Sequence, residues 1–252
     1  MGNQQLTPSQ FDTWASNIHH EMAFWRSWFS DEKFAAGRET RYRELRHAAY
    51  PPDLASELGV SPGVPLRVLD IGSGPISTQR MRARHYPVEL ICVDALADIY
   101  NLLLDEFGYA DCPRIHKIRG EELTRFFARD SFHLVNIANA LDHCEDPAQT
   151  VAEMFEVCRA GGRLEILSVE NEGEREGYNG LHQWNLQADD AGLWLWNPSM
   201  RVNLLDGLGG RFEYEWGYED HGQQDLRIFK VLVQKVSSAR RRAVRPSRQE
   251  AA

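Results

Sequence analysis

Two glycines that follow an apolar run give the chain its clearest binding signal. The segment RVLDIGSGPIST, residues 67–78, ends an apolar stretch at Asp70 and then turns through Gly72, Ser73 and Gly74. Glycine adopts positive φ angles and lets a ligand approach the backbone closely. In an open α/β sheet, the first turn from strand to helix lies at the carboxyl edge, where ligands bind. We therefore expect a ligand here, although a GxG on its own is also compatible with a turn that binds nothing.

An acidic residue at the end of the next apolar run narrows the class of ligand. The segment VELICVDA, residues 88–95, contains Asp94, which lies 24 residues after Asp70. A carboxylate at the tip of a second strand accepts hydrogen bonds from ribose hydroxyls, so the two segments together predict a cofactor that contains a nucleoside. A dinucleotide motif would have a further glycine three positions after Gly74, where this chain has Ser77. The pattern therefore disfavours NAD.

With these segments, the sequence resembles the class I S-adenosylmethionine-dependent methyltransferases over roughly residues 60–170. LDIGSGP resembles the glycine motif that holds the methionine part of the cofactor, although Ile76 replaces the family's third glycine. Asp94 matches the acidic residue that binds the ribose. IRGEEL matches the segment whose acidic side chain meets the adenine amine, and Glu121 is the better candidate there, with Glu122 as the alternative.

Two later segments continue the resemblance in the family's order. FHLVNIANALDHCEDP resembles the fourth-strand segment, with Asn136 where many relatives have an acid, and CRAGGRLEI resembles the turn into the fifth strand. The resemblance implies S-adenosyl-L-methionine as the cofactor. It assigns contacts with that cofactor to Asp70, Gly72, Ser73, Gly74, Asp94, Ala95, Glu121, Asn139 and Ala140.

Two histidines are the candidate catalytic bases beside this cofactor. His143 follows the fourth strand, and His182 follows the loop after the fifth strand, a region that commonly reaches over the acceptor pocket in the family. An imidazole titrates near neutrality and can take a proton from a hydroxyl or an amine. Each histidine can instead be structural, fixing its loop or capping a helix, and the sequence leaves both interpretations open.

Three further side chains are expected to bind the acceptor, and no metal site is expected. Trp25 and Trp184 can stack on an acceptor, and Asn185 can form a hydrogen bond with it. Residues 142–146 include several metal-ligating side chains in a row, but adjacent residues do not converge on one ion without a special loop. The sequence therefore predicts methyl transfer without a metal.

The elements that must position these residues alternate between strand and helix. The expected strands are 66–72, 88–95, 114–120, 132–138 and 161–170, and the expected helices between them are 77–85, 98–107 and 147–159. This alternation predicts a parallel, doubly wound α/β sheet with right-handed crossovers. Two further runs, FEYEWGYE and DLRIFKVLVQKV, predict an antiparallel C-terminal hairpin. Together they predict a Rossmann-like, mostly parallel sheet of seven strands.

Helical spacing and tryptophan placement mark the regions outside this sheet. Apolar residues predict N-terminal helices at 11–29, 35–49 and 53–58. All seven tryptophans lie before residue 29 or after residue 183, so we expect the first helix and residues 184–196 to meet above the cofactor as a lid. The expected units are a helical cap (1–62), a methyltransferase domain (63–236) with an acceptor-side insertion (170–200), and a basic disordered tail (237–252).

Composition and charge exclude several classes of protein. The chain of 252 residues has no apolar run near the ~18 residues that a membrane span needs, and its four cysteines without a CxxC pair indicate a cytoplasmic protein. The net charge is −9, and five arginines against one glutamate from residue 237 onward give +4, which leaves −13 on the body. An acidic body repels phosphates and disfavours nucleic acid as a partner.

The combined expectation is an enzyme that transfers a methyl group from S-adenosylmethionine to a hydroxyl or amine of a small molecule by direct in-line displacement. A cofactor-binding regulator or partner subunit without its own methyl transfer is the alternative from another class. An NAD-dependent oxidoreductase is a second alternative, which Ser77 and the lack of a Tyr-x-x-x-Lys pair disfavour. The identity of the acceptor and the oligomeric state stay open.

Overall fold

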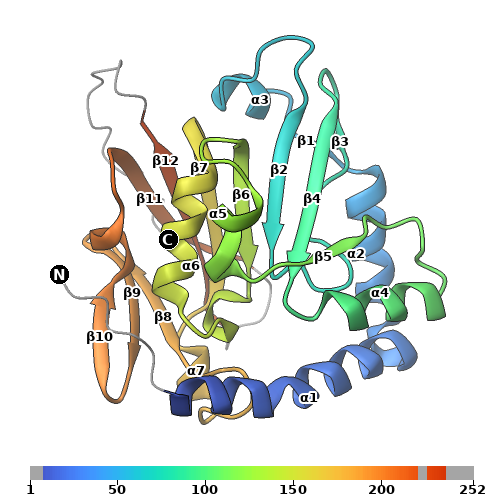
Figure 1. Cartoon of the computed structure of the whole chain (residues 1–252). Coiled ribbons are helices and arrows are strands. Elements are labelled where there is room, and N and C mark those ends of the chain that lie inside the picture. Colours follow the sequence, from blue (N-terminus) through green and yellow to red (C-terminus); the bar gives the residue numbers. More distant parts are fainter. Residues whose placement is uncertain (1–7, 221–225, 237–252) are drawn as a thin grey trace.

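A sheet of seven strands forms the centre of the protein (Figure 1). The computed structural model describes residues 8–220 and 226–236, so the basic tail expected at 237–252 lies outside the described residues. In order across the sheet, the strands are β11 (Phe212–Glu219), β12 (Ile228–Lys235), β7 (Cys158–Val169), β6 (Phe132–Ala138), β2 (Leu66–Ile71), β4 (Val88–Asp94) and β5 (Ile115–Lys117). The strands from β7 to β5 are parallel, and β12 pairs antiparallel with both β7 and β11. The expected mostly parallel sheet with an antiparallel hairpin is confirmed.

Burial on both faces explains why the central strands are almost continuously apolar. Every residue of β6 is buried except Ala138, and in β2 only Arg67 is partly exposed. Parallel strands joined by helical crossovers are covered on both faces, so neither face requires polar side chains. The buried polar residues in these strands, among them Asp70 and Asn136, therefore need partners inside the protein.

Helices between the strands cover the sheet. They are α4 (Ala97–Glu106), α5 (Leu123–Phe126), α6 (Pro147–Val157) and the short turns η2 (Gly120–Glu122) and η3 (Leu141–His143). Helix α6 begins where the Asp146 side chain accepts a hydrogen bond from Gln149 N, with Pro147 in its first turn. Among the described helices, none has both the length and the apolar character that crossing a bilayer demands.

The first helix, α1 (Pro8–Ser30), crosses beneath the carboxyl ends of the parallel strands (Figure 1). The chain then continues through η1 (Glu32–Phe34), α2 (Ala35–His47), β1 (Ala49–Tyr50) and α3 (Leu54–Glu57). Trp25, Trp28 and Phe29 of α1 are buried in one cluster with Tyr100 and Leu104 of α4. The apolar face of α1 therefore shares a core with the sheet and its helices.

The helix expected at residues 77–85 is not formed. Those residues run as a loop that contains β3 (Arg82–Ala83), a two-residue strand paired with β1. Ser77 Oγ donates a hydrogen bond to the buried carboxylate of Asp70, and Met81 N donates to Leu45 O at the end of α2. These bonds to distant segments replace the local bonds that a helix would need.

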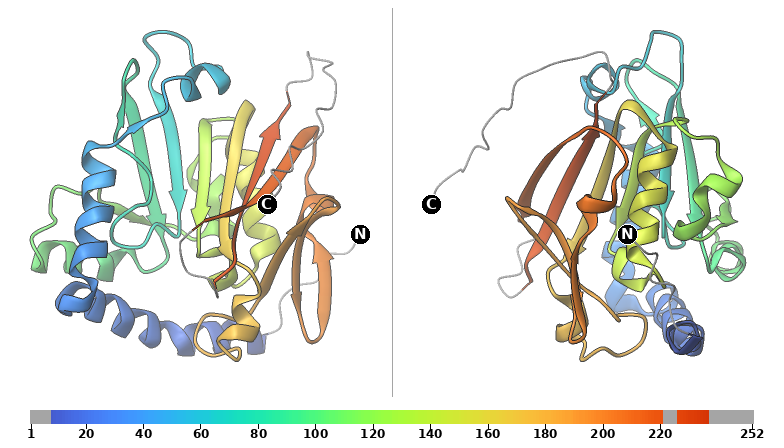
Figure 2. Two further views of the ribbon diagram at one scale, coloured as in Figure 1. Left: turned by 180° about the vertical axis from the view of Figure 1, so that it is seen from behind. Right: turned by 60° about the vertical axis from the view of Figure 1, so that its left-hand side comes forward.

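A second, smaller sheet follows β7 and was not predicted. The segment contains α7 (Glu172–Arg175), β8 (Asn185–Asp189), β9 (Gly192–Asn197), β10 (Met200–Asn203) and η4 (Leu204–Gly207). Strand β9 pairs antiparallel with both of its neighbours, and Leu186, Leu193 and Leu195 are buried in the core cluster of the main sheet. Figure 2 shows the small sheet beside β11 and β12, on the side of the molecule away from α2.

Candidate functional site

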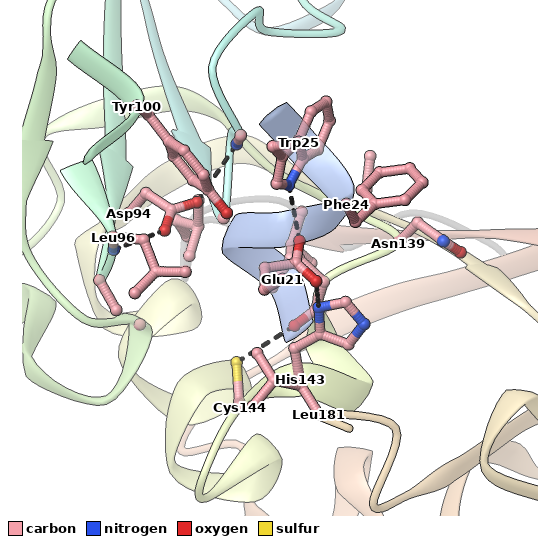
Figure 3. A pocket seen from close by; sticks show the side chains of 18 of the residues that line it. Glu21, Phe24, Trp25, Asp94, Leu96, Tyr100, Asn139, His143, Cys144 and Leu181 are labelled. Carbon is pink, nitrogen blue, oxygen red and sulfur yellow. Dashed lines mark hydrogen bonds and ion pairs between the residues drawn. The ribbon is translucent and has the colours of Figure 1, made fainter. Parts of the chain in front are cut away.

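A cavity of about 510 Å³ lies at the carboxyl edge of the main sheet, between the strand ends and α1. The loops after β2, β4, β5 and β6 form one wall, and residues 20–28 of α1 contribute the opposite wall (Figure 3). Gly180, Leu181 and His182 close a third side from the loop that precedes β8. Segments that are far apart in the sequence therefore line one cavity.

The glycine turn lies so close to its neighbours that side chains on it would meet other atoms at short distances. Gly72 has a φ of +56°, and a Cβ built on it would be 2.5 Å from Ala140 Cβ. Gly74 has a φ of +58°, and its Cβ would be 3.0 Å from Trp25 Cζ2. Both positions also require the left-handed backbone conformation that favours glycine. The turn thus presents bare backbone to the cavity, as expected from the sequence.

Asp70 supports the turn from behind the cavity rather than from its lining. The carboxylate is 1% exposed and accepts hydrogen bonds from Ser77 Oγ at 2.5 Å and Asn136 Nδ2 at 2.6 Å. Burial raises the pKa of Asp70, while these two bonds oppose the rise. An acid at position 136 would place a second negative charge beside Asp70, whereas the amide of Asn136 donates to it. Ser73 is buried at the same place, where its Oγ donates to Gly74 O.

Asp94 points into the cavity from the end of β4, opposite Glu21 of α1 (Figure 3). Its Oδ1 accepts a hydrogen bond from Leu96 N at 2.9 Å, and its Oδ2 accepts one from Gly74 N at 3.2 Å. Burial raises the pKa of Asp94 to about 6, the two backbone bonds oppose that rise, and the charge of Glu21 adds to it. The carboxylate therefore joins the second strand to the glycine turn and keeps acceptor capacity toward the cavity.

The other expected cofactor residues line the same space. Glu121 follows β5, and its Oε1 accepts a hydrogen bond from Asp146 N at 3.1 Å. Asn139 has a φ of +53°, which asparagine tolerates, and its Oδ1 accepts from Val169 N at 3.1 Å. Glu122, the alternative to Glu121, is absent from the described lining and pairs with Arg125. Ala95 and Ala140 complete the expected set in the cavity wall.

Arg41 of α2 is a binding candidate that the sequence analysis did not identify. Its guanidinium lines the cavity beside the glycine turn, where Nη2 donates to Ser73 O at 3.3 Å. The Arg41 Nε is buried and has no hydrogen-bond acceptor among the described residues. Burial lowers the pKa of Arg41, and the nearby charge of Asp70 opposes that effect. A partly buried cation with an unsatisfied donor beside a ligand turn is suited to hold an anionic group.

The two expected bases lie side by side, next to Asp142. His143 Nε2 is 3.1 Å from His182 Nδ1, and His182 Nδ1 is 2.8 Å from Asp142 Oδ2. Burial raises the pKa of Asp142, but the charges of His143 and His182 and the hydrogen bond from His182 outweigh burial, so the pKa is lowered. Because an ionised carboxylate only accepts, Nδ1 of His182 carries the hydrogen in this contact. Nε2 of His182 is then its basic nitrogen.

Two glutamates that the sequence analysis did not identify stand beside these histidines. Glu21 Oε1 accepts a hydrogen bond from Trp25 Nε1 at 2.6 Å, and Glu21 Oε2 lies 4.0 Å from His143 Nδ1 (Figure 3). Glu172 lines the cavity from α7, and burial, followed by the charge of Asp142, raises the pKa of Glu172 to about 7. The spacing of Glu21 one helical turn before Trp25 could have indicated its place in the cavity, whereas nothing in the sequence around Glu172 indicated its role.

Trp184 and Asn185, expected against the acceptor, are absent from the described lining of the cavity. Trp184 is 5% exposed in the main core, and its Nε1 donates to Cys144 O at 3.2 Å. Asn185 is fully buried, and its Oδ1 accepts from Glu174 N at 2.8 Å. These two residues stabilise the loop between α7 and β8. Their placement corrects the expectation that they bind the acceptor.

Of the two segments expected to form a lid, only the first helix contributes residues to the described lining of the cavity. Trp25 of α1 lines the cavity, at the glycine turn. From the second segment, residues 184–196, no residue is part of the described lining, because most of it forms β8 and β9 of the small sheet. Residues 180–182, just before that segment, face α1 across the cavity instead.

Comparison with known proteins identifies a methyltransferase domain in the chain. Residues 69–166 match the family described as "Methyltransferase domain". This range includes the glycine turn, Asp94, Glu121 and His143, and it leaves out α1, Arg41 and His182.

One curated relative and two solved structures show how far the similarity extends. Demethylmenaquinone methyltransferase of Renibacterium salmoninarum is 26% identical over 137 residues, which are 54% of this chain and 51% of that protein. The chain therefore spans about half the length of the curated relative that it matches. The 1,6-didemethyltoxoflavin-N1-methyltransferase of Burkholderia thailandensis, solved with 1,6-didemethyltoxoflavin and S-adenosylhomocysteine, is 17% identical with a TM-score of 0.53 and covers 94% of each chain. The CurJ carbon methyltransferase is 17% identical with a TM-score of 0.51, over 71% of this chain and 50% of the other. At such identities, the two structures show a shared fold.

Proposed function

We propose that this chain, in which residues 69–166 form a class I S-adenosylmethionine-dependent methyltransferase domain, transfers a methyl group from S-adenosyl-L-methionine to a small-molecule acceptor. One observation carries the proposal. A single cavity joins the glycine turn and Asp94, which suit a nucleoside cofactor, to the histidine pair His143 and His182, which suits proton removal. The family match supports this cofactor, and the shared fold agrees with it.

The residues of the cavity fit this cofactor. The bare backbone at Gly72 and Gly74 allows close approach, Asp94 offers carboxylate oxygens for ribose hydroxyls, and Glu121 offers an acceptor for an adenine amine. Arg41, with its unsatisfied Nε, would hold the carboxylate of the methionine part. When bound, the cofactor supplies a methyl group on a positively charged sulfur.

The work of the protein in such a transfer is to align the reactants and to exclude water. In a direct in-line transfer, a lone pair on the acceptor would bond to the methyl carbon as the carbon–sulfur bond breaks, and the electron pair of that bond would stay on sulfur. Holding both molecules in one cavity converts an encounter between two solutes into a reaction within one complex. Phe24, Trp25 and Leu181 in the cavity wall help to keep the reacting atoms dry.

An acceptor hydroxyl or amine must also lose a proton, and the histidine pair is placed to accept it. Asp142 fixes the ring of His182 through the 2.8 Å hydrogen bond to Nδ1, so Nε2 of His182 is the nitrogen that takes the proton. His143, whose Nε2 lies 3.1 Å from His182, is the alternative proton acceptor in the same wall.

The dimensions of the cavity favour a small acceptor. Its volume of about 510 Å³ has to hold both cofactor and acceptor, and α1 covers one side, which leaves little room for a polymer. The compared Burkholderia enzyme was solved with the small molecule 1,6-didemethyltoxoflavin bound, and the Renibacterium relative is named for demethylmenaquinone. These names support an acceptor of the small-molecule class and do not identify it.

The test has two measurements on the purified chain. Calorimetric titration with S-adenosylmethionine, S-adenosylhomocysteine and NAD should show binding of the first two and none of NAD. Incubation with S-adenosylmethionine and the small-molecule fraction of a cell extract should then form S-adenosylhomocysteine in a protein-dependent way. Binding without product formation would favour the alternative of a regulator or partner subunit, and the lack of binding would overturn the proposal.

A further inference from the structure

Three ligand-type atoms meet at the acceptor side of the cavity, where the sequence analysis expects no metal. We propose that Asp142, His143 and His182 bind one divalent transition-metal ion, with Zn²⁺ as the preferred ion, through Asp142 Oδ2, His143 Nε2 and His182 Nδ1. The ligand-type atoms of these three residues lie within 4.8 Å of one another. Two of the residues come from η3 and the third from the loop before β8, 39 residues after His143.

The separations of the three atoms match the spacing around one ion. Asp142 Oδ2 is 2.8 Å from His182 Nδ1, His143 Nε2 is 3.1 Å from His182 Nδ1, and Asp142 Oδ2 is 3.6 Å from His143 Nε2. Ligands about 2.0–2.1 Å from a tetrahedral Zn²⁺ are separated from one another by about 3.3 Å. The three observed values bracket that figure, so only small side-chain movements are needed to admit the ion.

Unsatisfied carboxylate oxygens around the three atoms are an independent sign of a missing cation. Asp142 is 1% exposed, and its second oxygen, Oδ1, has no hydrogen-bond donor among the described residues. Glu172, which lines the cavity and interacts electrostatically with Asp142, His143 and His182, has a buried Oε2 that likewise finds no donor in the described ranges. Buried oxygens of this kind cost free energy unless a donor or a cation compensates them.

The loop before β8 brings a third ligand to the two adjacent residues of η3, which could not surround an ion by themselves. From the sequence, residues 142–146 were rejected as a metal site because neighbours in a chain do not meet at one ion without a special loop. The structure brings His182 to Asp142 and His143, and the buried side chains of Trp184 and Asn185 brace the loop that carries it. At metal sites, residues around the ligands commonly hold them in place through hydrogen bonds.

The chemical types of the three ligands determine which ions the site prefers and how a bound ion can act. Two imidazoles and one carboxylate suit Zn²⁺ and the neighbouring transition metals, whereas Mg²⁺ prefers oxygen ligands. Three protein ligands leave at least one coordination position open, in a wall of the cavity, where an oxygen or nitrogen of the acceptor can bind. This use for acceptor binding relies on the proposed methyl transfer, while the metal site itself does not. With the ion bound, His182 Nδ1 is a ligand and its Nε2 carries the hydrogen, so the ion, and not His182, would then assist proton loss from the acceptor.

The experiment measures metal binding without any assay of activity. The full chain is freed of metal with a chelator, titrated with Zn²⁺ by calorimetry, and loaded with Co²⁺ to record the visible absorption of a tetrahedral site. We expect one Zn²⁺ per chain and a loss of affinity of at least about 100-fold in each of His143→Gln and His182→Gln. His20→Gln, which removes a cavity histidine outside the trio, should leave the affinity unchanged.

Each outcome has a defined meaning. Any of three results would overturn the metal site. The Zn²⁺ affinity is unchanged in both ligand variants, or it is just as weak in His20→Gln as in them, or the Co²⁺ spectrum lacks tetrahedral bands. Circular dichroism of the variants checks that they are folded, and the use of two separate ligand variants guards against one that is not. Titration with S-adenosylmethionine in the same samples separates the proposals. Cofactor binding without Zn²⁺ binding overturns the metal site and leaves the proposed cofactor site intact, whereas Zn²⁺ binding without cofactor binding overturns the proposed function and leaves the metal site intact.

Discussion

The indole of Trp25 lies against the α-carbon of Gly74, so closely that a Cβ on Gly74 would be 3.0 Å from Trp25 Cζ2. The same indole has the Arg41 guanidinium 5.6 Å from its ring centre and donates a hydrogen bond to Glu21. One side chain of α1 therefore contacts the glycine turn, a partly buried cation and the acidic residue that faces His143. The position of α1 and the shape of the turn are coupled through this ring.

Substitution of Gly74 tests this coupling. Gly74→Ala should lower the free energy of unfolding by about 1–2 kcal/mol from the backbone conformation alone, and further because the new methyl group displaces Trp25. Gly37→Ala is the matched control, since Gly37 lies in α2 with open space around its Cβ position, and it should stabilise the protein by about 0.5–1 kcal/mol. Urea unfolding measures both. Equal effects of the two substitutions would show that the turn is not constrained.

Removal of the Asp94 carboxylate should weaken the cofactor. Asp94→Ala deletes charge-assisted hydrogen bonds to ribose hydroxyls and should cost about 1.5–3 kcal/mol of binding free energy. Asp98→Ala removes an exposed carboxylate four residues later and should leave the affinity unchanged. Calorimetry with S-adenosylhomocysteine provides the measurement, and an unaltered affinity in Asp94→Ala would remove this residue from the site.

The raised pKa of Asp94 predicts how cofactor affinity depends on pH. In the free protein this pKa is about 6, and the titratable groups near the carboxylate include Glu21, His143, Tyr100 and Cys144. Only the ionised carboxylate accepts hydrogen bonds at both oxygens, so affinity should be steady above pH 6 and fall as the pH drops below it, by at most tenfold per pH unit. Asp94→Ala should flatten this part of the profile. A wild-type affinity that is constant from pH 7 to pH 5 would contradict the prediction.

Arg41 is expected to discriminate between cofactor fragments. Arg41→Met keeps a long apolar side chain and removes the charge, so affinity for S-adenosylhomocysteine should fall by about 1.5–3 kcal/mol. Affinity for methylthioadenosine, which lacks the amino-acid part, should stay the same. Arg43→Met, in the same helix with an exposed side chain, is the control. A loss that is equal for both ligands would show that Arg41 supports the fold of the cavity rather than the carboxylate.

The histidine pair is expected to govern turnover more than cofactor binding. His182→Gln and His143→Gln should lower the rate of methyl transfer about 10²–10⁴-fold for an acceptor that must lose a proton. His47→Gln, an exposed substitution outside the cavity, is the control. Single-turnover measurements at saturating S-adenosylmethionine give the rate. If both cavity variants turn over at nearly the wild-type rate, the protein acts by positioning alone.

The sequence was sufficient to predict the site residues that each lie at the end of a single strand. The glycine turn and Asp94 each close an apolar run, and a parallel sheet necessarily brings such ends to one edge. The strand at 132–138 and the strand FEYEWGYE were located with their observed bounds because apolar runs or alternation are local signals. No knowledge of distant contacts was required for these predictions.

The features that the sequence did not predict depend on contacts between distant segments of the chain. The loop at 77–85 was expected to be a helix because its bonds to α2 and to Asp70 are invisible in a local pattern. Arg41 resembles the other arginines of a charged helix until the fold places it beside the glycine turn. Aromatic content alone suggested a pocket for Trp184, whereas the fold buries this residue in the core.

Strand β12 lies inside the main sheet, between β7 and β11, although every other strand precedes it in the chain. Roughly 60 residues separate the end of β7 at Val169 from the start of β12 at Ile228. A ribosome adds about 5–20 residues per second, so for about 3–12 seconds the nascent chain carries β7 with an unpaired edge. The small sheet of β8 to β10 is made during that interval, and its leucines are then available to cover part of the exposed core.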